Sequence, residues 1–263
     1  MTARPRRLLA RRFVPRTWRT ALWGDRDRWG RIADRDDPMW HEWEATYGRF
    51  YDASQRQGVD RWVNQAGYRV LSQIDLSDRV VLEIGPGEIL HTAHWNGRPA
   101  HIHLVDVDEE MAMRGAAVLS RLGVSHDVHL LRDDHRLPLA DGSVDVVVSF
   151  YSLEHIWPLG PTLAEITRVM APDGLLVGAV PAEGGLAWGL GRLLTSRRWL
   201  RRHSSIDPDK LICWEHPNFA DDIVEQLDST FERRLVRRWP LRWLPYIDVN
   251  LLVTFVYRRR ACQ

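Results

Sequence analysis

The feature that most constrains this 263-residue chain is a short, mainly apolar run followed by two glycines. The run, Val80–Ile84, contains β-branched residues and does not alternate with polar ones, which is typical of a strand buried in a parallel sheet. Gly85 and Gly87 come next and allow a sharp turn and a close approach to a ligand. The sequence therefore predicts the first strand and loop of a nucleotide-type α/β fold, with the ligand beyond the carboxyl end of the strand.

This loop does not by itself identify the ligand. The dinucleotide fingerprint G-x-G-x-x-G requires a third glycine at the position where Leu90 stands, so the chain does not match it. The alternative to a ligand-binding loop is a Gly-Pro-Gly turn that follows a core strand and binds no ligand.

Acidic residues follow the next two predicted strands, 102–105 and 128–131. Asp106 lies about 20 residues past the glycines, where a carboxylate can accept hydrogen bonds from both ribose hydroxyls of a nucleotide-type ligand. One of Asp133 and Asp134 can accept from an adenine amino group. The alternative for all three is a solvated loop acid.

Strands and helices alternate through the middle of the chain. After the glycine loop we expect a helix over 89–95, strand 102–105, helix 109–122, strand 128–131, strand 144–149, helix 163–170 and strand 175–180. This alternation predicts a parallel sheet with right-handed crossovers. The loop 150–155 would then cross the top of the sheet beside the glycine loop.

The flanking segments predict additional helices and two further strands. Residues 38–54 carry one aromatic stripe, Trp40, Trp43, Tyr47, Phe50 and Tyr51, that either packs in a core or caps a ligand pocket. Residues 59–72 predict a second helix that buries Trp62, Val63, Ala66, Val70 and Leu71.

Residues 186–202 resemble one cationic amphipathic helix. This helix could be a lid, a membrane-surface helix or a clamp for an anionic substrate. A helix over 220–227 precedes strands 231–239 and 249–258.

Composition limits the kinds of partner. The formal net charge is +1, which gives no global field for nucleic acid. Cys213 and Cys262 are far apart and lack metal-ligand spacing, so we expect reduced thiols in the cytoplasm and no metal site.

Residues 2–31 are basic and rich in tryptophan, which favours a loosely ordered arm or, alternatively, a peripheral contact with anionic lipid at the inner face of the membrane. The oligomeric state is not evident.

Several motifs in order resemble one family. They are Glu83-Ile84-Gly85-Pro86-Gly87, Val105-Asp106, Asp133 before Leu137-Pro138, Asp141-Gly142-Ser143, Asp145 to Ser149, Leu153-Glu154-His155 and Pro172-Asp173-Gly174. This combination, over about residues 79–181, resembles the class I S-adenosylmethionine-dependent methyltransferases of the small-molecule type. Ile89 departs from the family pattern, which has a third glycine there.

The resemblance implies an α/β, Rossmann-like fold with a seven-stranded, mostly parallel sheet, helices on both faces, an N-terminal helical cap and an insert after strand five. The last strand would be antiparallel. It implies five segments: a basic N-terminal arm (1–37), a helical cap (38–78), the cofactor-binding core (79–182), a substrate-side insert (183–222) and C-terminal strands of the same sheet (223–263).

The resemblance also implies the cofactor S-adenosyl-L-methionine. The residues expected to bind it are Glu83, Gly85, Gly87, Asp106, Asp133, Asp134, Ser149 and Phe150. The reaction would be methyl transfer to an oxygen or nitrogen of a small-molecule or glycan-type acceptor, in which alignment and a general base are the main contributions. The candidates for the base are His155, His216, Tyr151 and Glu183, and Glu183 could instead orient a histidine.

Alternatives remain open at this point. A nicotinamide-dependent oxidoreductase uses a similar sheet, and a non-catalytic subunit could bind the same cofactor. Residues 183–185, Arg192 and residues 215–218 resemble bacterial methyltransferases associated with surface-polysaccharide assembly, and this is the basis for a glycan-type acceptor.

Overall fold

The computed structural model describes residues 10–55, 59–131 and 136–261. The strands are β1 (Val80–Ile84), β2 (His101–Asp106), β3 (His126–Leu130), β4 (Val144–Phe150), β5 (Met170–Pro181), β6 (Glu232–Trp239) and β7 (Leu252–Arg258). The helices are α1 (Ala10–Phe13), α2 (Arg16–Trp23), α3 (Arg26–Trp29), α4 (Pro38–Gln55), α5 (Val59–Tyr68), α6 (Glu109–Leu122), α7 (Leu159–Val169), α8 (Leu186–Leu194), α9 (Ser196–His203), α10 (Pro208–Glu215) and α11 (Ala220–Thr230). Three 3₁₀ turns are η1 (Arg69–Gln73), η2 (Thr92–His94) and η3 (Ile247–Val249).

The sheet has seven strands in the order β3-β2-β1-β4-β5-β7-β6. β1 to β5 are mutually parallel, and β7 runs antiparallel to both β5 and β6. The predicted seven-stranded, mostly parallel α/β fold is therefore confirmed, including its antiparallel last strand. The strand order reverses direction at β1 and β4, which places a crevice at the carboxyl ends of these two strands.

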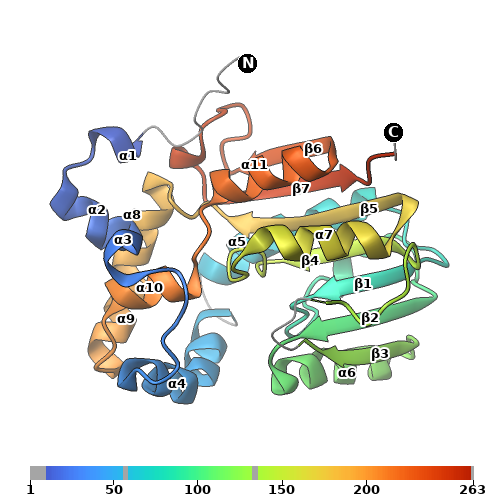
Figure 1. Cartoon of the computed structure of the whole chain (residues 1–263), viewed down its shortest axis with the longest axis horizontal. Helices are drawn as coiled ribbons and strands as arrows, with labels where there is room; N and C mark the ends of the chain where they lie inside the picture. The colour runs from blue at the N-terminus through green and yellow to red at the C-terminus, as the bar shows by residue number, and fades with distance from the viewer. Residues whose placement is uncertain (1–9, 56–58, 132–135, 262–263) are drawn as a thin grey trace.

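Helices cover both faces of this sheet (Figure 1). On one face, buried side chains of α7 and α11, such as Ile166 and Ile223, pack on the strands. On the other face, α6 and the segment around η1 contribute Leu119 and Leu71 to a second core cluster. The central strands therefore lie between two apolar layers, which explains why their sequences are continuously apolar.

The remaining helices gather at one end of the sheet, at the left of Figure 1. The aromatic stripe on α4 packs here: Trp43 is buried and contacts Phe50, whose ring in turn contacts Trp199 of α9. The stripe is thus a packing surface between α4 and the insert. Trp62 of α5 differs from the sequence prediction because it is 59% exposed, with its ring against that of Trp239.

Part of the basic arm is packed tightly. Leu22 and Trp23 are each 2% exposed and belong to the main core cluster. The Trp23 indole N–H also donates to the Gly185 carbonyl at 3.1 Å. Over α2 the expectation of a loosely ordered arm is therefore wrong, because two large apolar side chains anchor the helix. Residues 2–9 lie outside the described residues.

The segment predicted as one helix over 186–202 is two helices. α8 ends and α9 begins at Thr195, whose backbone is not helical. Arg192 and Arg197 are buried rather than in solvent: Arg192 donates to the Leu22 carbonyl at 3.2 Å, and Arg197 forms an ion pair with Asp209. These arginines hold the insert to the N-terminal helices. From the sequence pattern alone, buried arginines of this kind cannot be distinguished from arginines on a solvated face.

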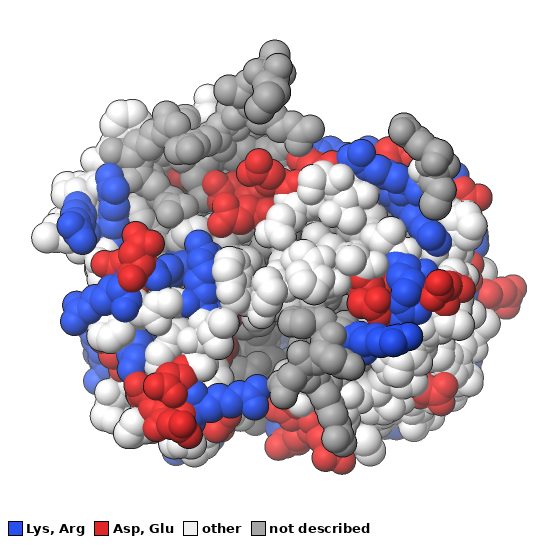
Figure 2. Space-filling view, in the orientation of Figure 1, with Lys and Arg blue, Asp and Glu red and all other residues white. Residues whose placement is uncertain are grey.

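Charges of both signs are interspersed over the face shown in Figure 2, without a large patch of either sign. Among the described residues, no helix combines the length and the apolar character that a membrane span requires.

Candidate functional site

The glycine loop begins where β1 ends. Gly85 and Gly87 have φ values of +66° and +49°, in the left-handed region that glycine adopts without strain. Ile89, which stands where the family pattern has a third glycine, has φ +45° although it is β-branched and buried, so it adopts the left-handed conformation that glycine favours. The predicted helix over 89–95 is wrong, because only the turn η2 forms there.

The space above Gly85 is occupied by the loop after β4. A Cβ at Gly85 would lie 2.6 Å from the Ser152 Cβ. The Ser152 hydroxyl donates to the Ile84 carbonyl at 2.9 Å and lies 2.5 Å from the hydroxyl of Ser149, which is fully buried. The absence of a side chain at Gly85 therefore lets the ends of β1 and β4 close on each other.

Glu83 is buried at the end of β1 and forms a hydrogen-bonded chain. The Trp95 indole donates to His91 Nδ1 at 3.0 Å, and His91 Nε2 lies 2.5 Å from Glu83 Oε1. An indole nitrogen can only donate, so Nδ1 accepts and Nε2 carries the proton given to Glu83. His91 and Trp95 thus fix the orientation of the acidic residue that the sequence places in the cofactor site.

Asp106 ends β2 at the same edge of the sheet. Its Oδ1 accepts the Asp108 backbone N–H at 3.0 Å, and burial raises the pKa of its carboxyl group. Val107, next in the chain, is 79% exposed and offers an apolar surface beside the carboxylate. Asp108 has a different task, because its side chain caps α6 through the Glu110 and Met111 N–H groups. Asp133 and Asp134 lie outside the described residues.

Phe150 and Tyr151 belong to an aromatic cluster on the inner side of the β4 loop. Phe150 is buried and contacts the rings of Tyr68 and His91. The Tyr151 hydroxyl donates to the Asn64 carbonyl of α5 at 3.2 Å, and burial raises the pKa of this tyrosine. Both effects hold the Tyr151 hydroxyl in its protonated form.

His216 and Glu183 meet across the insert. Glu183 follows β5 and is fully buried, and its Oε2 lies 3.0 Å from His216 Nδ1 and 2.8 Å from the Trp188 indole nitrogen. Burial opposes ionisation of Glu183, but the hydrogen bond from His216 and the nearby Arg192 and Arg26 lower its pKa to about 2. An ionised Glu183 holds the proton of His216 on Nδ1 and leaves the Nε2 lone pair available.

Two further carboxylates surround this pair. Glu154 is buried, its Oε2 has no hydrogen-bond partner among the described residues, and burial with the nearby Glu183 raises its pKa to about 7. His155 lies with Nδ1 3.6 Å from Glu215 Oε2, and its ring meets that of His216 at 4.7 Å between centroids. Environments that push two carboxyl pKa values apart are typical of acid–base sites.

Asn218 locks the insert onto the β4 loop. It is fully buried, and its side-chain amide donates to the carbonyls of Leu153 and Ile156 at 3.1 and 2.7 Å. This contact brings His216 and His155 together although they are far apart in the sequence.

The structure therefore unites three of the four predicted base candidates, His155, His216 and Glu183, and places Tyr151 deeper, against α5. The sequence analysis did not assign roles to Glu154 and Glu215, although each directly precedes a predicted histidine. The position of each glutamate next to a candidate histidine is the sequence signal that could have identified them.

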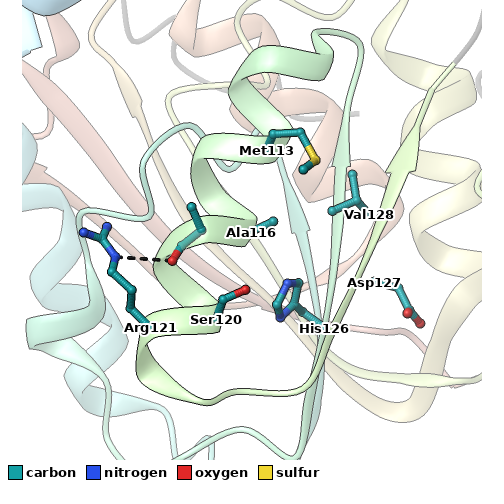
Figure 3. Close-up of a pocket in the computed structure, with 8 residues that line it drawn as sticks. Met113, Ala116, Ser120, Arg121, His126, Asp127 and Val128 are labelled. Atoms are coloured by element: carbon teal, nitrogen blue, oxygen red, sulfur yellow. Dashed lines mark hydrogen bonds between the residues drawn. The ribbon is translucent and has the colours of Figure 1, made fainter.

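A groove of about 810 Å³ lies elsewhere, between α6 and β3 (Figure 3). It is lined by Met113, Ala116, Ala117, Ser120, Arg121, His126, Asp127 and Val128. None of the predicted site residues lies in it, so it is not the site described above.

Comparison with known proteins agrees with the α/β fold. Residues 82–178 match the sequence model of a family described as "Methyltransferase domain". The chain is 32% identical over 103 residues to a Mycolicibacterium smegmatis protein described as a probable S-adenosylmethionine-dependent methyltransferase. It is 31% identical over 107 residues to a malonyl-[acyl-carrier protein] O-methyltransferase of Yersinia pestis. These alignments cover 39% and 41% of this chain, and each covers 38% of the relative.

A solved S-adenosylmethionine-dependent methyltransferase of Aquifex aeolicus shares the fold. The alignment has a TM-score of 0.52 at 15% identity and covers 81% of this chain and 98% of that structure.

The fold and the matched sequence together define a class I S-adenosylmethionine-dependent methyltransferase domain. Residues 82–178 of this chain match that family, whose cofactor is S-adenosyl-L-methionine. The comparisons give no support to the nicotinamide-dependent alternative.

Proposed function

We propose that the whole chain is a methyltransferase that transfers a methyl group to an oxygen or nitrogen of a small-molecule or glycan-type acceptor. The observation that carries this proposal is the hydrogen bond between Glu183 and His216, beside the loop that follows β4. A protein that only bound the cofactor would have no need for a histidine held in one tautomer by a buried carboxylate.

The residues present fit the cofactor. The left-handed turn at Gly85 and Gly87 follows β1 at the carboxyl edge of the sheet, and Asp106 ends β2 at the same edge, where its carboxylate can accept hydrogen bonds from ribose hydroxyls. Val107 offers an exposed apolar side chain to a nucleobase. When bound, S-adenosyl-L-methionine supplies an electrophilic methyl group, and the protein has to align the acceptor with it.

His216 is the proposed base. With Nδ1 hydrogen-bonded to Glu183, its Nε2 can take the proton of an acceptor hydroxyl or ammonium group, and Glu183 stabilises the imidazolium that results. Glu154 and His155 line the same spot, so the acceptor would meet a site rich in carboxylates and imidazoles. Such a site favours an acceptor that carries transferable protons.

Two similarities bear on the class of acceptor. The Yersinia pestis relative is named as an O-methyltransferase, which favours oxygen, and the resemblance of residues 183–185 and 215–218 to polysaccharide-associated enzymes favours a glycan.

Calorimetry and product assays test the proposal. We expect the protein to bind S-adenosyl-L-methionine but not NAD, and to release S-adenosyl-L-homocysteine when it is incubated with mixtures of sugars, amines and hydroxylated metabolites. Binding of the cofactor with no product from any acceptor mixture would favour the non-catalytic alternative. Binding of NAD alone would contradict the proposal.

A further inference from the structure

Four side chains of types that can bind metals lie together at the edge of the sheet. His101 and His103 are two residues apart on β2, and Asp127 and His129 are two residues apart on β3. Alternate residues of a strand point to the same face, and His103 is the register partner of Asp127. In Figure 3 the Asp127 side chain points away from α6, whereas His126 and Val128 lie on the helix side of the strand.

The donor atoms of these residues have the spacing of a metal site. Asp127 Oδ2 lies 3.2 Å from His101 Nε2 and 3.8 Å from His103 Nδ1, and His129 Nε2 lies 3.3 Å from His103 Nδ1. Zinc–ligand bonds of about 2.0–2.2 Å in a tetrahedral arrangement place ligand atoms about 3.3–3.6 Å apart. Small side-chain movements would therefore let His101, His103 and Asp127 bind one ion, with His129 beside them.

The surroundings suit imidazole ligation. Ser125 Oγ lies 2.9 Å from His101 Nδ1 and can accept its N–H, which leaves Nε2 for an ion. Neutral imidazoles and a carboxylate are the ligands that zinc binds.

We propose that His101, His103 and Asp127 form a divalent metal site for Zn²⁺ that fastens the edge strand β3 to β2. Among the described strands β3 pairs only with β2, so an ion bound by both strands would add a cross-link at the edge of the sheet. His101 begins β2 and Asp106 ends it, so the site lies at the opposite end of the strand from the cofactor edge. This placement gives the ion a structural role that is independent of methyl transfer.

A second group of possible ligands, Glu154, His155 and His216, lies in the site described above. In that site the Glu183 carboxylate, which also accepts from Trp188, holds His216 in the arrangement that we propose for a base. We therefore assign the zinc site to the sheet edge. The test has to separate the two locations.

Zn²⁺ titration of the metal-free full-length protein tests the assignment, with a competing chromophoric chelator as the readout. We expect one equivalent to bind and the thermal unfolding midpoint to rise with it. Asp127→Asn and His101→Ala should each weaken binding about 10-fold or more and reduce that rise. Asp127 is largely exposed, so Asp127→Asn tests the site with little risk to folding.

Two variants serve as controls. His126→Ala removes a histidine of the same strand on the opposite face, and His155→Ala removes a possible ligand of the second group. Both should keep the wild-type affinity for Zn²⁺. Absence of stoichiometric binding, unchanged affinity in Asp127→Asn and His101→Ala, or loss of binding in His155→Ala instead would each overturn the proposal.

Discussion

Glu183 Oε2 lies 3.0 Å from His216 Nδ1, so that a buried carboxylate after β5 holds a histidine that directly follows α10. The Trp188 indole donates to the same oxygen at 2.8 Å, and Arg26 donates to the His216 backbone carbonyl. Contacts from three segments therefore fix one imidazole. Such fixed geometry is what the base proposed for this site requires.

His216→Ala should lower turnover at least about 100-fold and leave the affinity for S-adenosyl-L-methionine within about two-fold, because the imidazole acts on the acceptor proton. Glu183→Gln should also lower turnover, since an amide cannot stabilise the imidazolium. Steady-state kinetics and calorimetry measure the two quantities. The exposed His203→Ala is the matched control, and near-normal turnover in His216→Ala would mean that alignment alone drives the reaction.

Glu154 should make stability depend on pH. Burial raises its pKa from an ordinary value near 4.5 to about 7, so the folded state holds the proton more tightly than the unfolded state. This contribution is fully present below about pH 4.5 and is lost as the pH rises through 7, with a limit on the order of 3 kcal/mol.

Glu154→Gln mimics the protonated form. It should raise the unfolding midpoint at pH 8 relative to wild type and change it little at pH 5. The exposed Glu225→Gln should give no such difference, and an equal effect of Glu154→Gln at both pH values would contradict the assignment.

Asp106→Ala should weaken cofactor binding about 10-fold or more, because a charge-assisted hydrogen bond to ribose contributes about 1.5–3 kcal/mol. Asp108→Ala should keep the affinity but lower stability by about 1 kcal/mol, since it removes the N-cap of α6. Calorimetry and thermal unfolding separate the two effects. The reverse pattern would mean that Asp108 contacts the ribose.

Gly85→Ala should lower the unfolding midpoint as well as cofactor affinity. The new Cβ would lie 2.6 Å from the Ser152 Cβ, and φ +66° costs a non-glycine residue about 1–2 kcal/mol. Adding Ser152→Gly to Gly85→Ala should recover part of the stability, because it removes the collision but not the backbone strain. An unfolding midpoint unchanged in Gly85→Ala would show that the two loops do not pack as described.

Peripheral membrane contact remains a proposal that vesicle sedimentation can test. Phe13, Trp18 and Leu194 are 82%, 59% and 73% exposed, and α2 and α8, which carry Trp18 and Leu194, pack together. We expect vesicles with anionic lipid to sediment the protein at low salt and to release it at high salt. Leu194→Asp should weaken the association, and neutral vesicles should bind little. Failure to sediment at low salt would mark this surface as ordinary solvent-exposed protein.

Local signals determined much of the fold from the sequence alone. The helix predicted over 109–122 is observed with those bounds, because Asp108 caps its start and Gly123, in the left-handed conformation, ends it. The apolar runs of β1 and β4 likewise specify strands buried on both faces. Capping and periodicity act between near neighbours, so they can be read without the tertiary structure.

Local signals were insufficient where the partner is distant in the chain. Arg192 and Arg197 belong to an amphipathic pattern that predicts a solvated face, yet the carbonyls of α2 and the Asp209 carboxylate draw both into the interior. Ile89 carries a β-branched side chain at a left-handed position, which favours glycine, and that side chain is buried in the surrounding core.

The sequence by itself determined the order of the strands, the glycine loop after β1 and the residue types available for chemistry. Only the tertiary structure decided which of these residues meet. Glu183 finds His216 because Asn218 fastens the insert to the β4 loop, and His103 meets Asp127 because β2 and β3 pair in one register. The physical reason is that a side chain's pKa, tautomer and ligand geometry depend on neighbours that folding brings within a few ångströms, which sequence separation does not encode.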